Sequence, residues 1–339
     1  MKKILVTGGL GYIGSHTVVE LIESGFEPVI IDDLSNSERF VLDRIEEITG
    51  KKPVFYEINL LNEIKLNKVF EENHFEGIIH FAAFKAVGES VEKPILYYKN
   101  NLGVLLNVLS CMNQYKLDNI INSSSCTVYG QAEKMPIDET FEIKKAFSPY
   151  AKTKIMGEEI ITDFVETYHK NAVSLRYFNP IGAHKSAKIG ELPKGIPNNL
   201  VPFITQTAAG IREELAVFGN DFPTLDGFAL RDYIYVVDLA KAHVLAMNRL
   251  INKENKLNHE FFNLGTGKGH TVFQVIEAFE KATGISIKYT ITSRRKGDIA
   301  TAYANADLAK KELNWQANTS IEESLKSAWE WQKTLPLPN

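Results

Sequence analysis

The sequence predicts an α/β protein with a Rossmann-type, doubly wound parallel sheet and a smaller C-terminal α/β substrate-binding domain. Six short apolar runs, rich in β-branched residues, occur in the first 180 residues, and stretches with helical periodicity separate them. Strands that alternate with helices in this way pair in parallel through right-handed crossovers. The runs are almost continuously apolar, which is typical of strands covered on both faces. A glycine-rich turn directly follows the first run.

The expected elements follow one another in a regular order. The six strands lie within residues 2–8, 27–32, 52–58, 77–83, 119–125 and 172–178, and helices are expected over 12–24 and 95–115. Residues 180–199 carry few apolar side chains and predict a long loop, which at that length is usually functional. Short apolar runs and helices near 199–210, 236–250 and 271–282 follow, with two helical stretches at the end. We expect an NAD-binding domain over 1–180 and a smaller substrate domain over 181–339, with some interleaving of the chain.

Composition excludes several classes of function. The formal net charge of −4 leaves no basic surface for nucleic acid. Cys111 and Cys126 are the two cysteines, so we expect a reducing compartment and no disulfide scaffold. The first apolar run, residues 4–6, is shorter than the roughly 7–15 residues of a secretory signal, and no window approaches the roughly 18 apolar residues of a membrane span. We expect a cytoplasmic protein without a membrane partner, and the scattered histidines predict no metal site.

The glycine-rich turn "TGGLGYIG" places Gly8, Gly11 and Gly14 between the first strand and the first helix. Glycine is needed where the chain turns sharply, where the backbone approaches a pyrophosphate, and where helix and strand pack closely. The second expected strand ends in Asp32, a carboxylate suited to a ribose 2′-hydroxyl, which favours NAD over NADP. The spacing Gly-x-x-Gly-x-x-Gly resembles that of the short-chain dehydrogenase/reductase superfamily.

Tyr150 and Lys154 stand four residues apart in "SPYAKTK", so a helix would place them on one face. A nearby cation favours a phenolate. We therefore expect Lys154, together with the positive charge of an oxidised nicotinamide, to lower the pKa of Tyr150 towards neutrality. Ser125 ends the strand "NIINSSS" and is a candidate hydrogen-bond partner for the reacting oxygen. Taken alone, the same residues also fit an ordinary helix start and a strand-end turn.

Motifs along nearly the whole chain resemble one family. They include "HFAAFKAVGESVEKP", "SSSCTVYG", "LRYFNPIGAH", "FGNDFPTLDG", "RDYIYVVDLA" and "RRKGD". The sequence is similar to the UDP-glucose 4-epimerases, extended short-chain dehydrogenase/reductases. The resemblance implies NAD-dependent interconversion of UDP-glucose and UDP-galactose: C4 is oxidised, the 4-keto sugar turns, and C4 is reduced again. It makes Tyr150, Ser125 and Lys154 catalytic, and it implies a homodimer formed through two helices of the first domain.

The resemblance also implies which residues bind the two ligands. Those assigned to NAD are Gly8, Gly11, Tyr12, Ile13, Gly14, Asp32, Asp33, Leu34, Ser35, Asn36, Ser37, Asn59, Leu60, Phe81, Ala82, Ala83, Phe84, Lys85, Asn100, Ser125, Tyr150, Lys154 and Phe178. Those assigned to the UDP-hexose are Lys85, Ser125, Tyr150, Asn179, Asn199, Leu200, Ala216, Val217, Phe218, Arg231, Arg295, Asp298 and Ala302. Two arginines suit a pyrophosphate, because the guanidinium fork matches phosphate oxygens.

Two positions depart from the pattern of familiar relatives. Asn59 stands where those proteins often have an aspartate that reaches the adenine amino group; asparagine keeps an acceptor oxygen, so we expect binding to persist. Some family members have a bulky tyrosine four residues after the aspartate of "RRKGD", where this chain has Ala302 followed by Tyr303. We expect a roomier sugar pocket that admits UDP-GlcNAc and UDP-GalNAc, unless a shift of one residue lets Tyr303 fill the space.

Three other functions compete with this one. A nucleotide-sugar 4,6-dehydratase needs carboxylates directly after the catalytic Ser or Thr, where this chain has Cys126, Thr127 and Val128. A UDP-glucuronate decarboxylase needs a uronate site, for which the sequence offers no candidate. A non-catalytic dinucleotide-binding regulator would have no reason to combine Ser125, Tyr150 and Lys154.

Overall fold

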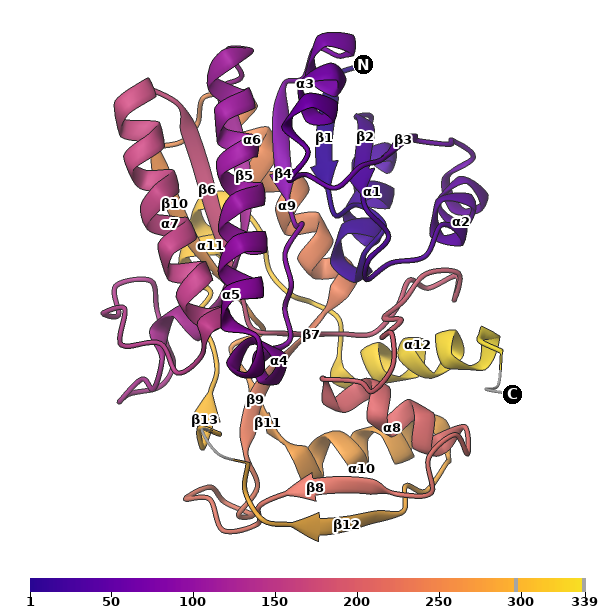
Figure 1. Cartoon of the computed structure of the whole chain (residues 1–339). Coiled ribbons are helices and arrows are strands. Elements are labelled where there is room, and N and C mark those ends of the chain that lie inside the picture. Colours follow the sequence, from indigo (N-terminus) through magenta and orange to yellow (C-terminus); the bar gives the residue numbers. More distant parts are fainter. Residues whose placement is uncertain (296–297, 337–339) are drawn as a thin grey trace.

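A seven-stranded parallel sheet forms the centre of the upper lobe in the computed structural model, which describes residues 1–295 and 298–336 (Figure 1). The strand order is β10-β6-β5-β4-β1-β2-β3. The strands are β1 (Lys3–Thr7), β2 (Glu27–Asp32), β3 (Val54–Glu57), β4 (Gly77–His80), β5 (Asn119–Ser125), β6 (Asn171–Tyr177) and β10 (His259–Leu264). The first six coincide with the expected strands, and the predicted fold class is confirmed.

Helices cover both faces of this sheet. One face packs on α1 (Tyr12–Glu23), α2 (Phe40–Thr49), α9 (Val236–Ile251) and α11 (Asp307–Leu313). The other packs on α3 (Glu63–Glu72), α6 (Gly103–Gln114) and α7 (Pro149–Tyr168), which lie in front of the sheet in Figure 1. Successive residues of the central strands enter the two cores alternately, as Ile4, Leu5 and Val6 of β1 do, which explains the largely apolar strand sequences. The strand order reverses between β1 and β4, the place where such sheets bind ligands.

The smaller lobe is built from short elements below the main sheet (Figure 1). Strand β9 (Leu230–Tyr235) pairs with β7 (Asn179–Ile181), β11 (Gly269–Thr271) and β13 (Thr301–Ala302), and β8 (Leu215–Phe218) pairs with β12 (Tyr289–Thr292). Their core packs against α8 (Leu200–Ala208), α10 (Val272–Thr283) and α12 (Ile321–Thr334).

Three segments that follow residue 181 return to the upper lobe. Helix α9 packs on α1, β10 pairs in parallel with β6 along its whole length, and α11 packs on α9 and β10. The division at residue 180, which we expect to allow some interleaving of the chain, assigns the run that contains β10 to the second domain, whereas this strand completes the first sheet. A strand's partner is set by long-range packing, which its own residues do not specify.

The remaining helical segments lie at the lower end of the sheet or next to it. They are α4 (Val87–Glu92), α5 (Pro94–Tyr97), the π-helical η1 (Tyr98–Leu102) and the 3₁₀-helical η2 (Cys126–Tyr129). Within residues 1–295 and 298–336, no helix combines the length and the apolar character needed to cross a membrane.

Candidate active site

A cleft of about 1020 Å³ runs along the carboxyl ends of the central strands. Its walls come from the turns after β1, β2, β4 and β5, from the start of α7, and from the loop that precedes α8. The expected residues that line it are Gly8, Gly11, Tyr12, Ile13, Gly14, Asp32, Asp33, Ser35, Asn36, Ser37, Asn59, Leu60, Phe81, Ala82, Ala83, Phe84, Lys85, Asn100, Ser125, Tyr150, Lys154, Phe178, Asn179 and Asn199. The cleft therefore gathers most of the residues assigned to NAD, together with the three assigned to catalysis.

The glycine turn has no room for side chains at two of its positions. A Cβ on Gly14 would lie 2.2 Å from the carbonyl oxygen of Gly8, and one on Gly8 would lie 2.9 Å from the backbone nitrogen of Ala82. Gly8 also has a φ of +69°, which favours glycine. Gly11 caps α1 without a side-chain hydrogen bond, so the first N–H groups of this helix face the cleft. A narrow glycine cradle at the N-terminus of a long helix fits a dinucleotide pyrophosphate.

Asp32 ends β2 and organises the turn beside this cradle. Its carboxylate accepts hydrogen bonds from the backbone N–H groups of Leu10 (3.1 Å) and Leu34 (3.0 Å) and from the Ser37 hydroxyl (2.6 Å). Burial raises the pKa of Asp32, and these hydrogen bonds oppose the shift. The carboxylate lines the cleft where a ribose would lie next to the glycine turn.

Asn59 already uses both ends of its amide within the protein. Its nitrogen donates to Asp33 Oδ2 at 2.8 Å, and its oxygen accepts from the backbone N–H of Leu61 at 2.9 Å. The oxygen that was expected to accept from an adenine amino group thus has one lone pair left for that purpose.

Helix α7 presents Tyr150 and Lys154 to the cleft from its first turns. The helix begins at Pro149, and the hydroxyl of Ser148 accepts a hydrogen bond from the N–H of Ala151 (3.1 Å), an N-terminal cap followed by a proline at the first helical position. The Lys154 ammonium lies 5.9 Å from the centre of the Tyr150 ring. "SPYAKTK" is therefore the start of a helix. Its N-terminal cap fixes where the helix begins and so which way Tyr150 and Lys154 point.

Ser125 lies opposite this helix at the end of β5. Its hydroxyl oxygen accepts hydrogen bonds from the N–H (3.2 Å) and the hydroxyl (3.0 Å) of Thr127. Two residues earlier, the carbonyl oxygen of Ser123 accepts a hydrogen bond of 2.5 Å from Lys154 Nζ. The strand end and the helix start are thereby joined directly.

Burial dominates the protonation of this group in the protein without its cofactor. Burial raises the pKa of Tyr150 to about 12, and the interaction with Ser125 opposes that shift. Burial lowers the pKa of Lys154 to about 8, and the nearby Glu158 carboxylate opposes that shift. The predicted lowering of the Tyr150 pKa depends on Lys154 together with an oxidised nicotinamide, so it stays a prediction.

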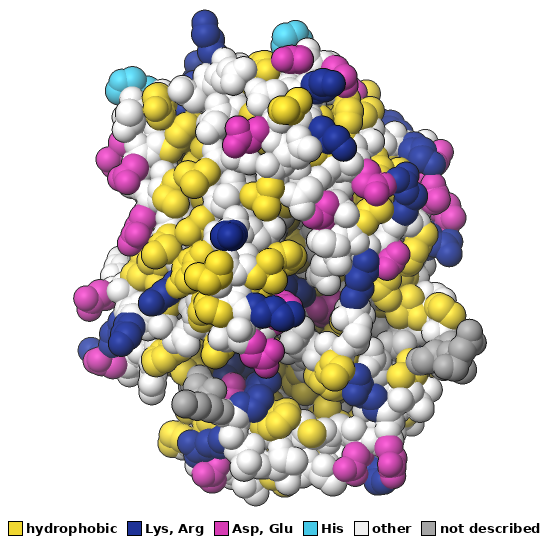
Figure 2. Space-filling view, in the orientation of Figure 1, with side chains coloured by type: hydrophobic (Ala, Val, Ile, Leu, Met, Phe, Trp, Pro, Cys, Tyr) yellow, Lys and Arg dark blue, Asp and Glu magenta, His cyan; other side chains and the backbone are white. Residues whose placement is uncertain are grey.

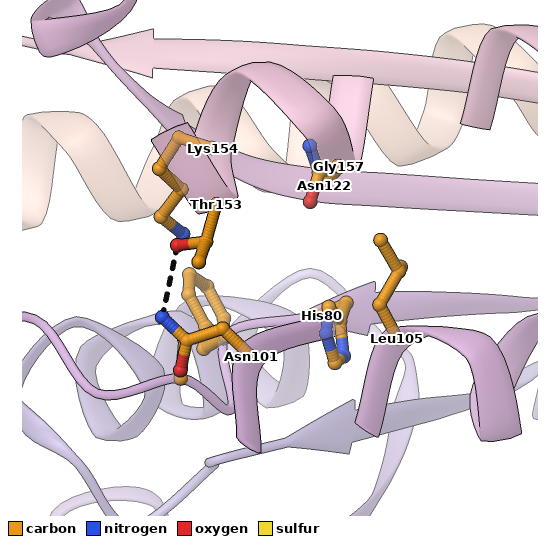
Figure 3. A pocket seen from close by; sticks show the side chains of 9 residues that line it. His80, Asn101, Leu105, Asn122, Thr153, Lys154 and Gly157 are labelled. Carbon is orange, nitrogen blue, oxygen red and sulfur yellow. Dashed lines mark hydrogen bonds between the residues drawn. The ribbon is translucent and has the colours of Figure 1, made fainter. Parts of the chain in front are cut away.

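A small cavity lies behind Lys154 (Figure 3). Its volume of about 20 Å³ is room for one water molecule. Asn101 Nδ2 donates to Thr153 Oγ1 at 3.1 Å beside it, and His80 Nδ1 lies 2.8 Å from Thr7 Oγ1. Burial lowers the pKa of His80 to about 3. His80 is therefore a neutral, hydrogen-bonded residue below the cleft.

Nine expected residues do not line the cleft: Leu34, Leu200, Ala216, Val217, Phe218, Arg231, Arg295, Asp298 and Ala302. Several of them lie near one another in the smaller lobe. Arg295 forms an ion pair with Asp298 (2.9 Å), and its guanidinium lies 5.0 Å from the centre of the Phe218 ring.

Arg231 and Ala302 face each other across the β9–β13 pairing of the smaller lobe. The Arg231 guanidinium donates to the carbonyl oxygens of Leu230 (2.8 Å) and Ala300 (3.4 Å), and burial lowers its pKa. Ala302 is 5% exposed. The smaller lobe thus carries a second cluster of expected residues, separate from the cleft wall.

Glu191 is a cleft residue that sequence reasoning missed. Its carboxylate accepts hydrogen bonds from Lys85 Nζ (3.1 Å) and Asn199 Nδ2 (2.6 Å), and its carbonyl accepts one from Trp331 Nε1 (2.9 Å). Lys194 of the same loop donates to the carbonyl of Leu34 at 2.8 Å. The length of the loop predicted a function, but nothing local distinguished Glu191 from other glutamates. Among the described residues, no three His, Cys, Asp or Glu side chains are grouped to hold a metal.

Comparisons with known proteins agree with this geometry. The model of the GDP-mannose 4,6 dehydratase family matches residues 5–328. The UDP-glucose 4-epimerase of Bacillus subtilis is 49% identical over 332 residues, 98% of this chain and 97% of the relative.

Two solved structures are also similar. One is the UDP-glucose 4-epimerase of Stenotrophomonas maltophila with bound NAD and formylated UDP-arabinopyranose (TM-score 0.95, 43% identity, 98% of each chain). The other is the UDP-Glc/GlcNAc 4-epimerase of Campylobacter jejuni (TM-score 0.85, 32% identity, 99% of this chain and 100% of the other).

Proposed function

The chain belongs to the UDP-glucose 4-epimerase family, and from this premise we propose how its own residues carry out the reaction. It is an NAD-dependent isomerase that interconverts UDP-glucose and UDP-galactose. When bound, NAD supplies the acceptor and the donor of the hydride at C4 of the sugar. One observation carries the assignment to residues: Tyr150, Lys154 and Ser125 line the same cleft as the glycine turn and Asp32.

The cofactor would be held along the carboxyl edge of the upper sheet. The first turn of α1 would receive the pyrophosphate, because its N–H groups are free and its dipole favours an anion. Asp32 would accept a hydrogen bond from a ribose hydroxyl, and Lys154 would donate one to the ribose nearest the reacting ring. These roles place the reactive end of the cofactor beside Tyr150.

Tyr150 would exchange the proton of the sugar 4-hydroxyl. It accepts that proton when C4 is oxidised and returns it after the keto sugar has turned, while Ser125 orients the oxygen. A phenol with a pKa of about 12 is a poor base near neutral pH. Two positive charges, Lys154 and the oxidised nicotinamide ring, would stabilise its phenolate while the cofactor is oxidised.

The UDP part of the substrate would lie between the cleft and the smaller lobe. Arg231 and Arg295 are suited to the pyrophosphate, and Asp298 orients the Arg295 guanidinium through their ion pair. Asn199 would approach from the loop before α8, where its amide nitrogen bonds Glu191.

The most direct test is to incubate the purified protein with UDP-galactose, without added NAD, and to analyse the nucleotide sugars. We expect UDP-glucose, because each turnover regenerates NAD, which can therefore stay bound as a prosthetic group. A protein that contains NAD by extraction and absorbance but forms no UDP-glucose would contradict the proposal. A dehydratase would instead accumulate a 4-keto-6-deoxy sugar, which Cys126, Thr127 and Val128 cannot help to form because they carry no carboxylate.

We also propose that the N-acetylated pair, UDP-GlcNAc and UDP-GalNAc, are substrates. The similarity to a UDP-Glc/GlcNAc 4-epimerase supports this. The expected role of Ala302, which pairs with Arg231 and does not line the cleft, stays a prediction. Assays of both sugar pairs test it. Absence of turnover of the N-acetylated pair, at enzyme concentrations that equilibrate UDP-glucose, would exclude it.

We also propose that the protein is a cytoplasmic homodimer. The exposed face formed by α4 to α7 supports the dimer. Val91, Ile95, Leu96, Leu106 and Met156 are exposed there by 39–64%, and hydrophobic side chains gather on this face in Figure 2. A contiguous apolar patch commonly marks an association surface. Two free cysteines, Cys111 and Cys126, fit a reducing compartment. Sedimentation equilibrium would give twice the chain mass; a monomer at all concentrations would exclude the dimer.

A further inference from the structure

Glu158 continues the face of α7 that carries the proposed catalytic residues. Tyr150, Lys154 and Glu158 are spaced i, i+4 and i+8, so the three side chains follow one another along that face. Glu158 is 3% exposed. A carboxylate is rarely buried to this degree unless it is paired and hydrogen-bonded.

Glu158 connects α7 to both strands behind the site. Its Oε1 accepts hydrogen bonds from the hydroxyl of Ser124 (2.5 Å) and from Arg176 Nε (2.9 Å), and its Oε2 accepts one from Arg176 Nη2 (2.7 Å). Ser124 precedes Ser125 on β5, and Arg176 precedes Tyr177 on β6. One carboxylate therefore joins the helix of Tyr150 to the strand of Ser125.

Arg176 is itself held firmly. Its Nη1 donates to the Tyr129 hydroxyl (2.9 Å), which donates to Asn263 Oδ1 (2.7 Å). Its guanidinium lies between two rings, 5.0 Å from the centre of Tyr129 and 4.6 Å from that of Phe261. The partner of Glu158 is thus held by a hydrogen bond and by two aromatic rings, which opposes movement of the carboxylate.

We propose that Glu158 is a positioning residue for the epimerase reaction, which holds Tyr150 and Lys154 in register with Ser125 and keeps Lys154 charged through its negative charge. This inference rests on the roles proposed above for Tyr150, Lys154 and Ser125. Lys154 acts on the phenolate only as an ammonium. Burial lowers its pKa to about 8, and Glu158 is the group that opposes this shift.

Other titratable groups around Lys154 and Glu158 do not provide Lys154 with a negative charge. On β4 and β10, burial lowers the pKa of His80 and of His259 to about 3, so both are neutral. On η2 and β6, burial raises the pKa of Cys126, of Tyr129 and of Tyr177. The pKa of Glu139, which burial also raises, is affected by Arg176, and Arg176 bonds Glu158; the charge that affects the pKa of Lys154 is that of Glu158. The charged neighbour of Lys154 is Glu158.

The test is the pH dependence of kcat for UDP-galactose, measured on the NAD-containing enzyme. In the wild type we expect kcat to fall at high pH as Lys154 loses its proton, which gives the alkaline limb of the pH profile. In Glu158→Gln the pKa of Lys154 falls, so we expect the alkaline limb to move to lower pH by about one unit. Glu158→Asp keeps the charge, and its limb should stay near that of the wild type even if kcat decreases.

Ser124→Ala separates position from charge. It removes one hydrogen bond to Glu158 but leaves the carboxylate, so we expect a lower kcat with an unmoved alkaline limb. A limb in Ser124→Ala that moves as far as in Glu158→Gln would overturn the electrostatic role. Wild-type profiles in both Glu158→Gln and Glu158→Asp would overturn the whole inference.

Arg176 has no partner carboxylate in Glu158→Gln, and the variant can fail to fold for that reason. The double variant Glu158→Gln/Arg176→Met removes both buried charges, and we expect the limb to move in the same direction but less, because loss of the Arg176 cation partly offsets loss of the carboxylate. If Tyr150→Phe abolishes turnover while the Glu158 variants keep the wild-type profile, only this inference fails. If Tyr150→Phe remains fully active, the proposed roles of Tyr150 and Lys154 fail first.

Discussion

The two halves of the proposed active site are built in different ways. The cofactor half lies on the ends of adjacent parallel strands, and backbone groups fix it: the glycine cradle, the hydrogen bonds to Asp32, and the Lys154–Ser123 bond. The substrate half consists of short strands β8, β9 and β13, with an Arg295 side chain that is 56% exposed and paired with Asp298.

This difference teaches where a sequence pattern determines a site. Parallel strands in one sheet share an edge, so residues at their ends meet wherever the strands occur in the chain. The substrate cluster has no such common edge. Its residues meet only because β8, β9 and β13 are brought together by the packing of the smaller lobe. The following experiments test this contrast, from the largest expected effect to the smallest.

Tyr150→Phe should cause the largest loss. Removing a general acid–base group typically lowers the rate by about 10²- to 10⁴-fold, so we expect kcat to fall by that factor while NAD stays bound. Tyr168→Phe is the matched control, because Tyr168 is an exposed residue on the same helix. The measurements are kcat and NAD content by absorbance; near-normal turnover in Tyr150→Phe would refute the mechanism.

Arg231→Met should weaken substrate binding. A hydrogen bond from a charged group contributes about 1.5–3 kcal/mol, which corresponds to an increase in KM for UDP-galactose of about 10- to 100-fold. We expect a smaller change in kcat, because the pyrophosphate does not react. Arg212→Met, whose side chain lies over Phe203 and bonds Gln206, is the control. An unchanged KM would mean that Arg231 is only structural.

Gly14→Ala tests the rigidity of the cofactor half. The new Cβ would lie 2.2 Å from the Gly8 carbonyl oxygen, so strand and helix must separate. We expect a loss of stability of about 1–3 kcal/mol and loss of bound NAD. Gly88→Ala is the control, because a Cβ there meets open space within a helix. Thermal unfolding and NAD content are the measurements; full NAD occupancy in Gly14→Ala would count against the cradle.

Lys194→Ala should have the smallest effect. Lys194 connects the loop before α8 to the Leu34 carbonyl (2.8 Å) and to Glu38 (3.3 Å) across the cleft. Exposed ion pairs contribute about 0.2–1 kcal/mol, so we expect NAD to dissociate at most a few times faster, and less so at high salt. Lys281→Ala, which removes an exposed pair with Glu322 far from the cleft, is the control. Identical release rates would show that this contact does not hold the cofactor.

The sequence determined the main sheet and the location of the cofactor cleft. Short, largely apolar runs identified the six strands, because burial on both faces favours apolar residues at successive positions. The glycine turn was recognisable because a sharp turn with close packing leaves no room for side chains. The i, i+4 spacing placed Tyr150 and Lys154 on one face of a helix. These are local rules, so residues near one another in the chain contain the information.

Only the tertiary structure decided the rest. It paired β10 with β6, moved Arg231 and Ala302 away from the cleft wall, and brought Glu191 of a loop to Lys85. It also set the pKa of Tyr150 in the protein without cofactor, which burial raises to about 12, because the free energy of a charge depends on how completely the surrounding protein excludes water. The sequence by itself identifies the proposed reacting groups. Their pKa values depend on burial and on residues distant in the chain, which only the tertiary structure brings together.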